Sequence, residues 1–471
     1  MRTLLHFFTA GLVLALAACA NLEPTGPARD KTYAITILHT NDHHGRFWQN
    51  SDGEYGMAAR KTVVDGIRAE VAASGGYSLL LDGGDVNTGV PESDLQDAVP
   101  DFKGMNLLGY DAMAVGNHEF DKSPAVLAMQ RKLATFPMLS ANIYRGGERI
   151  FAPYKLFNLG GVRIAVMGLT TEDTQKLGNP DNMRALEFRS PIQEAAKLVP
   201  ELRAQADVVI AATHMGHYAN GQHGIQAPGD VEMARAVTGL DLVVGGHTQN
   251  PACMKAENVL DSTYVPGTPC QPDRQNGTWI VQAHEWGKYV GRADFQYRNG
   301  AFTLVKYALI PINLKQTAPF AEDPQMLALL QPYQAFGQSK LLVNVGSSDA
   351  RLEGDRSVVR KAPTSLGMLI GQAMMDKTRS DFAVVNAGGI RDSLPAGAIT
   401  YKDILKVQPF GNTLVTLRLT GREVLDYLQV AARMSPGAGG FPHFSGVEVT
   451  TAAGTIAEVR VRGVALDPAG T

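Results

Sequence analysis

Side chains that can bind metal ions or transfer protons follow six short apolar runs of this sequence. Each run has the composition of a β-strand and ends near a small or turn-forming residue. Because ligand sites in α/β proteins lie beyond the carboxyl ends of strands, we expect these side chains to share one site. The runs and the polar residues after them are 35–38 before Asn41, Asp42 and His44; 78–81 before Asp82 and Asp85; 112–115 before Asn117 and His118; 164–167 before Thr170; 208–212 before His214; and 242–244 before His247 and Gln249.

Seven of these side chains form a donor set for divalent metal ions. Asp42 and His44 are two residues apart, so on an extended backbone both would point to the same side and hold one ion. Asp85 follows two glycines, which let the backbone turn closely and free its carboxylate to bridge two ions. The set contains oxygen and nitrogen donors without thiolate, which favours Mn, Zn, Co or Fe in a hydrolytic two-metal centre over a structural zinc. The predicted ligands are Asp42, His44, Asp85, Asn117, His214, His247 and Gln249.

Each of these residues, taken singly, has an ordinary structural explanation. A histidine after a strand is more often a buried residue with a satisfied hydrogen bond than a metal ligand. Five segments that each end on a ligand type favour the metal site. We expect the remaining polar residues of these segments to be caps, turn formers or partners that orient the ligands. These residues are Asn41, His43, Asp82, Glu119 and His217.

His118 and Asp121 differ from the predicted ligands, because their spacing suits proton transfer. The imidazole can face a reacting group, while the carboxylate three residues later orients the ring and favours its protonated form. The alternative is that Asp121 caps a helix that begins near Ser123. We favour the catalytic pair, since it adjoins a predicted ligand.

The elements that position these residues follow an α/β pattern in two domains. At 471 residues the chain is too long for one ordinary core. The pattern predicts a catalytic domain over 31–318, a linker helix within 319–340 and a second α/β domain over 341–471. We expect helices at 57–73 and 191–206 in the first domain, at 323–337 in the linker, and at 365–378 and 421–432 in the second domain.

The charge composition bounds the partners. The chain has 43 Lys and Arg against 46 Asp and Glu, a formal net charge of −3, and no basic block. We therefore expect no binding surface for DNA or RNA. The hydrophobic content of 45% is typical of a well-packed globular protein, which we expect to be a monomer.

The amino terminus predicts export and lipid attachment. An apolar stretch over 4–18 follows Arg2 and is too short for a typical membrane span, which indicates a secretory signal. It ends in Leu16, Ala17, Ala18 and Cys19, which resembles a bacterial lipobox whose cysteine is acylated. The alternative is an ordinary signal peptide with a chance cysteine. Residues 20–30 then form a tether, and we expect a lipoprotein of the bacterial cell envelope, facing the periplasm or anchored in the outer membrane.

The other two cysteines, Cys253 and Cys270, form an even pair in an exported protein, which predicts a disulfide. The loop between them is rich in turn residues, with little helix or strand periodicity of its own. A soft metal site from the two thiols is the alternative, but no histidine lies nearby.

The order and content of the motifs resemble the 5′-nucleotidase family, whose catalytic domain is a calcineurin-like metallophosphoesterase of layered mixed sheets. The likeness is greatest to the bacterial periplasmic members that hydrolyse UDP-sugars and 5′-nucleotides, and it runs from about Thr36 to the end of the chain. The matching blocks are TNDHHG, DGGD, GNHEFD, THMGH, GGHTQ, VQAHEWGKYVGRADF, RLEGDR, NAGGIRDS and LKVQPFGN.

The resemblance implies a role for each matching residue. One metal ion takes Asp42, His44, Asp85 and Gln249, the other takes Asp85, Asn117, His214 and His247, and His118 with Asp121 forms the catalytic dyad. In the second domain, the resemblance implies three anion-binding arginines, Arg356, Arg360 and Arg391. It also implies a base-stacking ring, Phe410, and base contacts at Asn412 and Gly439. Taken without the resemblance, these arginines could equally form surface ion pairs, and Phe410 could be a core residue.

The implied function is hydrolysis of 5′-nucleotides and UDP-sugars to nucleosides and phosphate for scavenging, with two divalent ions, Zn, Mn or Co. The alternatives are a related phosphoesterase that acts on cyclic nucleotides or a sulfur ester, and a nucleotide-binding surface lipoprotein with little turnover. The family's closing segment, with a second stacking aromatic and an acidic residue, is expected to follow the last residue, Thr471. We therefore expect the second domain to be incomplete as written.

Overall fold

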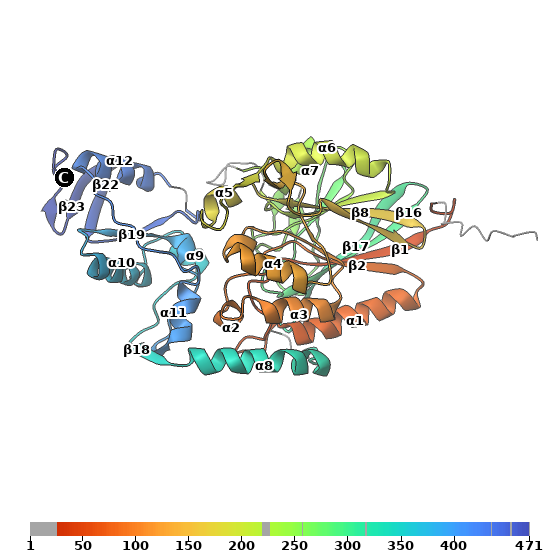
Figure 1. Ribbon diagram of the computed structural model, residues 1–471, viewed down its shortest axis with the longest axis horizontal. Coiled ribbons are helices and arrows are strands. Elements are labelled where there is room, and N and C mark those ends of the chain that lie inside the picture. Colours follow the sequence, from red (N-terminus) through yellow and green to blue (C-terminus); the bar gives the residue numbers. More distant parts are fainter. Residues whose placement is uncertain are drawn as a thin grey trace, which may run out of the picture.

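The structure is a computed structural model that describes residues 26–218, 227–256, 258–315, 318–434, 436–452 and 455–470. The elements before α8 (Pro324–Leu341) build a larger body, and those after it build a smaller one (Figure 1). α8 runs beneath the larger body and leads into the smaller one. Cys19, the predicted lipid site, lies outside the described residues.

The first sheet of the larger body has six strands and a parallel centre. β1 to β4 pair in parallel, and β16 and β17 add antiparallel strands at one edge. In sheet order the strands are β17 (Ala301–Pro311), β16 (Tyr289–Arg298), β1 (Tyr33–Thr40), β2 (Tyr77–Asp82), β3 (Ala112–Ala114) and β4 (Met138–Leu139).

The second sheet also has six strands with a parallel centre. β8, β10, β11 and β15 pair in parallel, and β7 and β14 are antiparallel edge strands. In sheet order the strands are β14 (Asp273–Gln275), β15 (Thr278–Val281), β11 (Leu242–Val244), β10 (Val208–His214), β8 (Val162–Thr170) and β7 (Tyr154–Leu159).

The two sheets pack face to face and carry helices on their outer faces, which gives four layers (Figure 1). Ile35 and Leu79 of the first sheet share a buried core with Val166 and Ile210 of the second. Because the central strands are buried on both faces, their sequences are continuous apolar runs. The outer helices are α1 (Met57–Ala73), α3 (Val99–Leu108) and α4 (Pro124–Leu133) on the first sheet, and α6 (Pro191–Arg203) and α7 (Asp230–Ala236) on the second.

Short elements connect these layers. β5 pairs with β6 and β9 in a small sheet, and β12 pairs with β13 in a hairpin. The short elements are α2 (Pro91–Asp94), η1 (His118–Phe120), β5 (Ile143–Arg145), β6 (Glu148–Arg149), α5 (Thr174–Leu177), β9 (Leu186–Phe188), β12 (Met254–Ala256) and β13 (Val259–Leu260).

The smaller body has short sheets covered by helices around a core that includes Leu366, Val385 and Val407. Its strands are β18 (Asn344–Ser348) with β20 (Gly397–Thr400), β19 (Ala383–Asn386) with β21 (Pro442–Ser445), and β22 (Val447–Ala452) with β23 (Thr455–Val461) and β24 (Val464–Ala465). Its helices are α9 (Arg356–Val359), α10 (Ser365–Thr378), η2 (Ala387–Gly389), α11 (Tyr401–Val407) and α12 (Gly421–Ala432).

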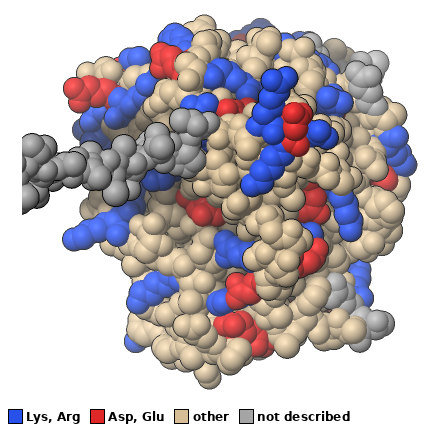
Figure 2. Space-filling view, turned by 90° about the vertical axis from the view of Figure 1, so that its right-hand side faces the viewer, with Lys and Arg blue, Asp and Glu red and all other residues tan. Residues whose placement is uncertain are grey.

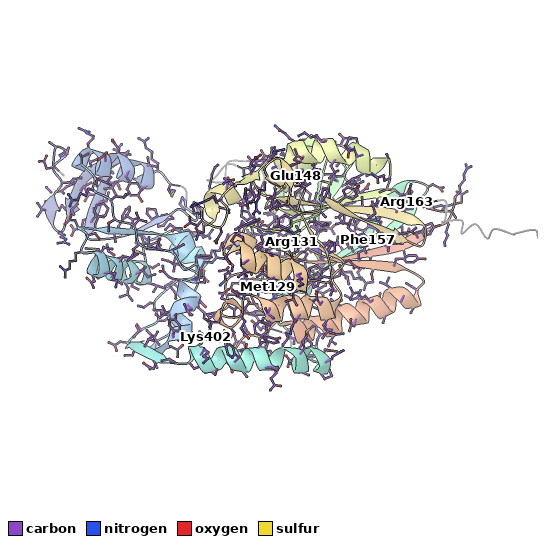
Figure 3. The ribbon with its side chains drawn as sticks, in the orientation of Figure 1. Met129, Arg131, Glu148, Phe157, Arg163 and Lys402 are labelled. Carbon is purple, nitrogen blue, oxygen red and sulfur yellow. A yellow bond between two sulfur atoms is a disulfide. The ribbon has the colours of Figure 1, made fainter. Side chains whose placement is uncertain are left out.

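The two bodies contact each other beside α8. Lys402 of α11, labelled in Figure 3, forms an ion pair with the buried Glu92 of α2. Gln96 donates a hydrogen bond of 3.0 Å to the carbonyl of Tyr333 in α8. These contacts join α8, the larger body and the smaller body at one place.

Three predicted helices, α1, α10 and α12, have the bounds that we expected, and two differ. α6 ends at Arg203 rather than near 206, because the N–H of Asp207 already donates to the carbonyl of Arg163 in β8. α8 begins at Pro324 and continues to Leu341, beyond the predicted 337, because Leu341 is buried.

The predicted disulfide between Cys253 and Cys270 is confirmed. Both cysteines pack in a small buried cluster with Tyr289 and Leu309. The loop that they close contains the paired strands β12 and β13, although its sequence shows little strand periodicity. The short hairpin carries too few residues for its periodicity to be visible in sequence.

The surface opposite the smaller body carries interspersed charges (Figure 2). Arg163, at the right of Figure 3, pairs with Asp207 at 3.0 Å.

Among the described residues, no helix is both long and apolar enough to cross a membrane.

Candidate metal centre

The carboxyl ends of β1, β2 and β3 meet those of β10 and β11 at one edge of the two sheets. The loops after these strands touch through backbone atoms. A Cβ placed on Gly83, after β2, would lie 2.5 Å from the carbonyl oxygen of Gly245, after β11. Glycine alone permits this approach, and it brings the polar residues of both sheets together as predicted.

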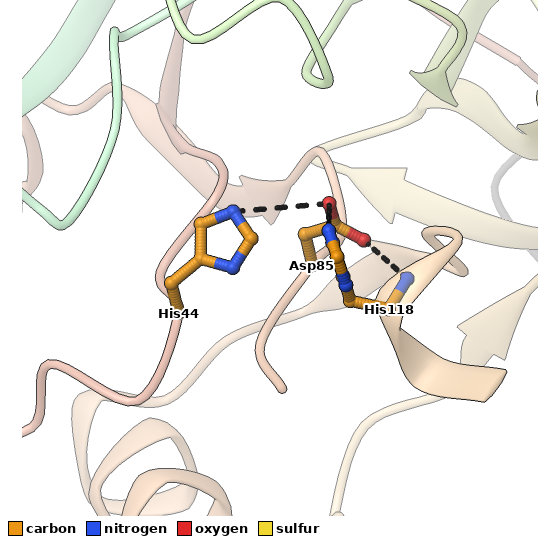
Figure 4. Close-up of side chains that lie close together, drawn as sticks. All are labelled: His44, Asp85 and His118. Atoms are coloured by element: carbon orange, nitrogen blue, oxygen red, sulfur yellow. Dashed lines mark hydrogen bonds and ion pairs between the residues drawn. The ribbon is translucent and has the colours of Figure 1, made fainter. Parts of the chain in front are cut away.

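The carboxylate of Asp85 is at the centre of the site. Its Oδ2 lies 2.9 Å from Nε2 of His214. The same oxygen lies 3.9 Å from Nε2 of both His44 and His118 (Figure 4). Two groups of possible ligands share Asp85, one with His44 and His118 and the other with His214 and His247. Within each group the ligand atoms lie within 4.8 Å of one another. One carboxylate is therefore placed to serve two cation positions.

The other predicted ligands surround the same point. Gln249 Nε2 lies 2.6 Å from His44 Nε2, and His247 Nδ1 lies 3.3 Å from His214 Nε2. Asp42 Oδ2 accepts a hydrogen bond of 2.8 Å from the N–H of His247. The structure thus brings six of the seven predicted ligands together, and the seventh, Asn117, directly precedes His118.

Two buried oxygens are suited to bind a cation. Asp42 Oδ1 and Asn117 Oδ1 are buried and have no hydrogen-bond partner among the residues that the structure describes. Buried polar atoms are rarely left unpaired, and metal coordination satisfies such oxygens. The donor set and its orphaned oxygens therefore suit divalent ions.

The histidine rings are oriented by backbone carbonyls. His214 Nδ1 lies 2.7 Å from the carbonyl of Gly83, and His44 Nδ1 lies 2.8 Å from that of Thr88. A ligand histidine usually donates its second N–H in this way, which leaves the other nitrogen with its lone pair toward the ion. In both rings, Nε2 faces Asp85.

The electrostatics of the site favour positive charge. Burial alone would lower the pKa of His214, but Asp85 and Asp42 raise it to about 10. Burial raises the pKa of Asp42 to about 6 despite the opposing effect of His214. Buried carboxylates that draw protons onto a neighbouring imidazole also provide the field that binds cations.

Most predicted ligands have a left-handed backbone. Five of the seven predicted ligands have positive φ, an uncommon conformation for residues other than glycine. They are Asp42 (φ 51°), His44 (φ 50°), Asp85 (φ 62°), His247 (φ 76°) and Gln249 (φ 59°). Asp42 and His44 lie in a loop whose N–H groups donate to Gly84 and Asp85. The expectation that an extended backbone places them on one side was therefore wrong, although their side chains do approach to 3.8 Å.

His118 and Asp121 form the predicted pair. His118 Nδ1 lies 2.6 Å from Asp121 Oδ2. Burial lowers the pKa of His118, but Asp121 and Asp85 raise it to about 9. Ser123 caps α4 through its side chain and the N–H of Val126, so the alternative role of Asp121 as helix cap was wrong.

Residues of the smaller body reach this centre. Arg356 Nη1 donates a 2.6 Å hydrogen bond to Gln249 Oε1. The ring of Phe410 stacks on His118 with centroids 5.5 Å apart and an interplanar angle of 12°, and the guanidinium of Arg391 lies 5.4 Å from the Phe410 ring.

The three arginines lie close enough to repel one another. Burial and its arginine neighbours lower the pKa of Arg360 to about 9, and burial and Arg356 lower that of Arg391 to about 10. A Cβ on Gly439 would lie 3.8 Å from Arg360 Cζ, and Asn412 is exposed. Three guanidinium groups that repel one another beside a metal centre provide the positive charge that a polyanionic ligand would neutralise.

The residues expected to have structural roles are all buried and polar. His43 Nε2 lies 2.9 Å from Asp101, His217 Nε2 lies 2.8 Å from Asp273, and Asp82 accepts from Thr40. Asn41 Nδ2 donates to Asp42, and Glu119 accepts from several backbone groups near Asp85. Thr170, which follows the apolar run 164–167, uses its hydroxyl to donate a hydrogen bond to the carbonyl of Val115.

Tyr218, a neighbour of the site, was not predicted from the sequence. The Tyr218 ring lies edge-on to the His247 ring, with centroids 6.5 Å apart. Its only signal in the sequence is that it directly follows the THMGH block.

Comparisons with known proteins show which family the chain resembles in both of its parts. A family model described as calcineurin-like phosphoesterase matches residues 35–251, and one described as 5′-nucleotidase, C-terminal domain, matches residues 344–471. Protein UshA of Escherichia coli is 57% identical over 94% of this chain and 84% of that protein. A 5′-nucleotidase of Vibrio cholerae is 53% identical over 97% of this chain and 86% of that protein.

Solved structures show the same fold. A 5′-nucleotidase precursor from Thermus thermophilus has a TM-score of 0.75 and 31% identity over 93% of this chain and 88% of that one. The sulfate thiohydrolase SoxB from Thermus thermophilus has a TM-score of 0.71 and 20% identity over 94% of this chain and 88% of that one, which is a likeness of fold alone.

The central position of Asp85 predicts that Asp85→Asn impairs the binding of two metal ions. The substitution keeps the shape of the side chain but removes the charge that offsets two cations. We expect metal-free Asp85→Asn protein to bind fewer than two Mn²⁺ ions per chain in isothermal titration calorimetry, where the wild type binds two. Asp207→Asn, at the opposite end of β10 from His214, is the control and should bind as the wild type does. Two tight ions on Asp85→Asn would contradict the bridging assignment.

Proposed function

The chain belongs to the 5′-nucleotidase family and is a metallophosphoesterase, and we propose that it hydrolyses 5′-nucleotides and UDP-sugars to nucleosides and phosphate. The observation that carries this proposal is the carboxylate of Asp85, which is shared by two groups of possible ligand atoms, one of which includes His118. We assign one ion to Asp42, His44, Asp85 and Gln249, and the other to Asp85, Asn117, His214 and His247. Zn, Mn and Co fit this donor set.

Bound divalent ions would supply an activated water and polarise the phosphorus centre. Residues of the chain would then orient the ester and donate a proton to it. His118 is held by Asp121 through Nδ1, which leaves Nε2 to face the site. Burial lowers the pKa of this ring, but the Asp121 carboxylate at 2.6 Å raises it and so favours the protonated ring. It can therefore donate a hydrogen bond to the phosphoryl group or a proton to the departing oxygen.

The smaller body supplies recognition of the nucleotide. Arg356, Arg360 and Arg391 offer planar guanidinium groups to phosphate, and Phe410 offers a ring face to the base. Asn412 and Gly439 are the proposed base contacts. The Phe410 face that meets His118 is covered by that stacking contact, so a base that used this face would require the two rings to separate. Binding would then include a movement of one body relative to the other.

We also propose that the chain acts as a monomer and is anchored through lipid on Cys19 at a bacterial envelope membrane. The support is the lipobox-like segment that ends at Cys19 and the disulfide between Cys253 and Cys270, which is typical of exported proteins.

The proposed role of His118 predicts a selective loss of turnover. His118→Ala should lower kcat for AMP by about 10²-fold or more, because the proton donor is lost. The metal content, measured by elemental analysis after dialysis, should stay at that of the wild type. An equal loss of bound metal would instead make His118 a ligand, as its place in the first donor group permits.

The proposed stacking residue predicts a dependence on the substrate. Phe410→Ala should raise KM for AMP and leave the hydrolysis of a small aryl phosphate nearly unchanged, because the ring holds the base, which is remote from the reacting phosphorus. Steady-state kinetics with both substrates tests this. Similar losses on the two substrates would assign Phe410 to folding rather than recognition.

Cys19→Ser tests the anchor. Since acyl chains would supply the attachment, the variant should move from the membrane fraction to the soluble envelope fraction on cell fractionation. Wild-type protein that already fractionates as soluble, with an unmodified amino terminus in mass spectrometry, would show that the lipobox interpretation is wrong.

A further inference from the structure

Glu119 accepts hydrogen bonds from both loops that flank the Asp85 carboxylate. Its Oε1 accepts from the N–H groups of Val86 at 2.8 Å and Asn87 at 3.3 Å, and from Asn87 Nδ2 at 3.2 Å. Its Oε2 accepts from the N–H of Asp85 at 3.1 Å and from that of Gly116 at 2.7 Å. The side chain is fully buried. One carboxylate therefore joins the loop after β2 to the loop after β3.

These two loops meet at the proposed bridging ligand. A Cβ on Gly116 would lie 2.2 Å from Asp85 Oδ1, and the N–H of His118 donates to that oxygen at 2.9 Å. The approach is possible only because residue 116 is glycine. The position of the Asp85 carboxylate thus depends on how closely the two loops are held.

The backbone at Asp85 also needs restraint. Its φ of 62° is left-handed, a conformation that a residue other than glycine keeps only where the surrounding contacts fix it. Glu119 binds the N–H groups of Asp85 and of the next two residues, Val86 and Asn87. The strained segment is thereby fixed at its own backbone.

The contacts of Glu119 indicate positioning rather than charge balance. Among the described residues, Glu119 forms no ion pair with a lysine or arginine. Its Asn87 partner is held in turn by Gln130, through bonds of 2.6 Å and 3.1 Å. A saturated network of directional bonds fixes geometry.

We propose that Glu119 is a positioning residue that holds the loops of Asp85 and Asn117 at the separation that both metal ions require. This proposal rests on the metal centre proposed above. Four of the five hydrogen bonds to Glu119 come from backbone N–H groups of these loops, so its effect on the ions would pass through the loop backbone.

The test is Mn²⁺ binding to metal-free protein by isothermal titration calorimetry, with thermal unfolding of the same samples. Glu119→Gln places an amide donor against backbone N–H groups and should raise the Kd for Mn²⁺ by about 10- to 100-fold. Glu119→Asp keeps the charge but is one methylene shorter, and should also raise the Kd; it decides the question if the glutamine variant does not fold.

Glu194→Gln is the matched control. Glu194 is a buried carboxylate of the same body that accepts from Tyr144, Arg149 and Lys197, away from the metal loops. We expect this variant to lose thermal stability and keep the wild-type Kd. A wild-type Kd for a folded Glu119 variant, or an equal loss in Glu194→Gln, would overturn the proposal. Wild-type protein that binds no Mn²⁺ would overturn the metal centre itself.

Discussion

The carboxylate of Asp85 must sit where the loops of two separate sheets meet, and the local structure follows from that constraint. His214 comes from the second sheet and His44 from the first, yet both rings turn Nε2 toward the same carboxylate. The loops can approach this closely because glycines stand at the contacts, as at Gly83 and Gly116. The buried layers of apolar strands supply the rigid base on which these loops are held.

This convergence carries an energetic penalty. Left-handed backbones at residues such as Asp42 and His247 cost roughly 1 to 3 kcal/mol each, and orphaned buried oxygens add to the cost. Bound cations would satisfy those oxygens and offset the repulsion between buried carboxylates. Burial alone would lower the pKa of His214, but the negative field of the Asp85 and Asp42 carboxylates raises it.

Features that are local in sequence could be predicted, and features that depend on contacts between loops could not. The bounds of α1 and α10 were predictable from their boundary residues and apolar pattern, and the proposed ligands were found because each follows a buried strand. The left-handed turn at Asp42 was missed because the sequence alone does not show that Gly84 and Asp85 accept hydrogen bonds from that loop. The stacking of Phe410 on His118 joins residues from two bodies, and a reading of one segment at a time does not reveal it. Glu119 was expected to be only a cap or orienting partner, since its five donors become visible only when two loops are in place.

Whether one carboxylate holds two ions can be measured by anomalous diffraction from Mn²⁺-soaked crystals. If it does, the map will contain two anomalous peaks, both within bonding distance of the Asp85 carboxylate, one beside His44 and the other beside His214. A single peak, or two peaks that do not share Asp85, would show that this carboxylate does not bridge two ions.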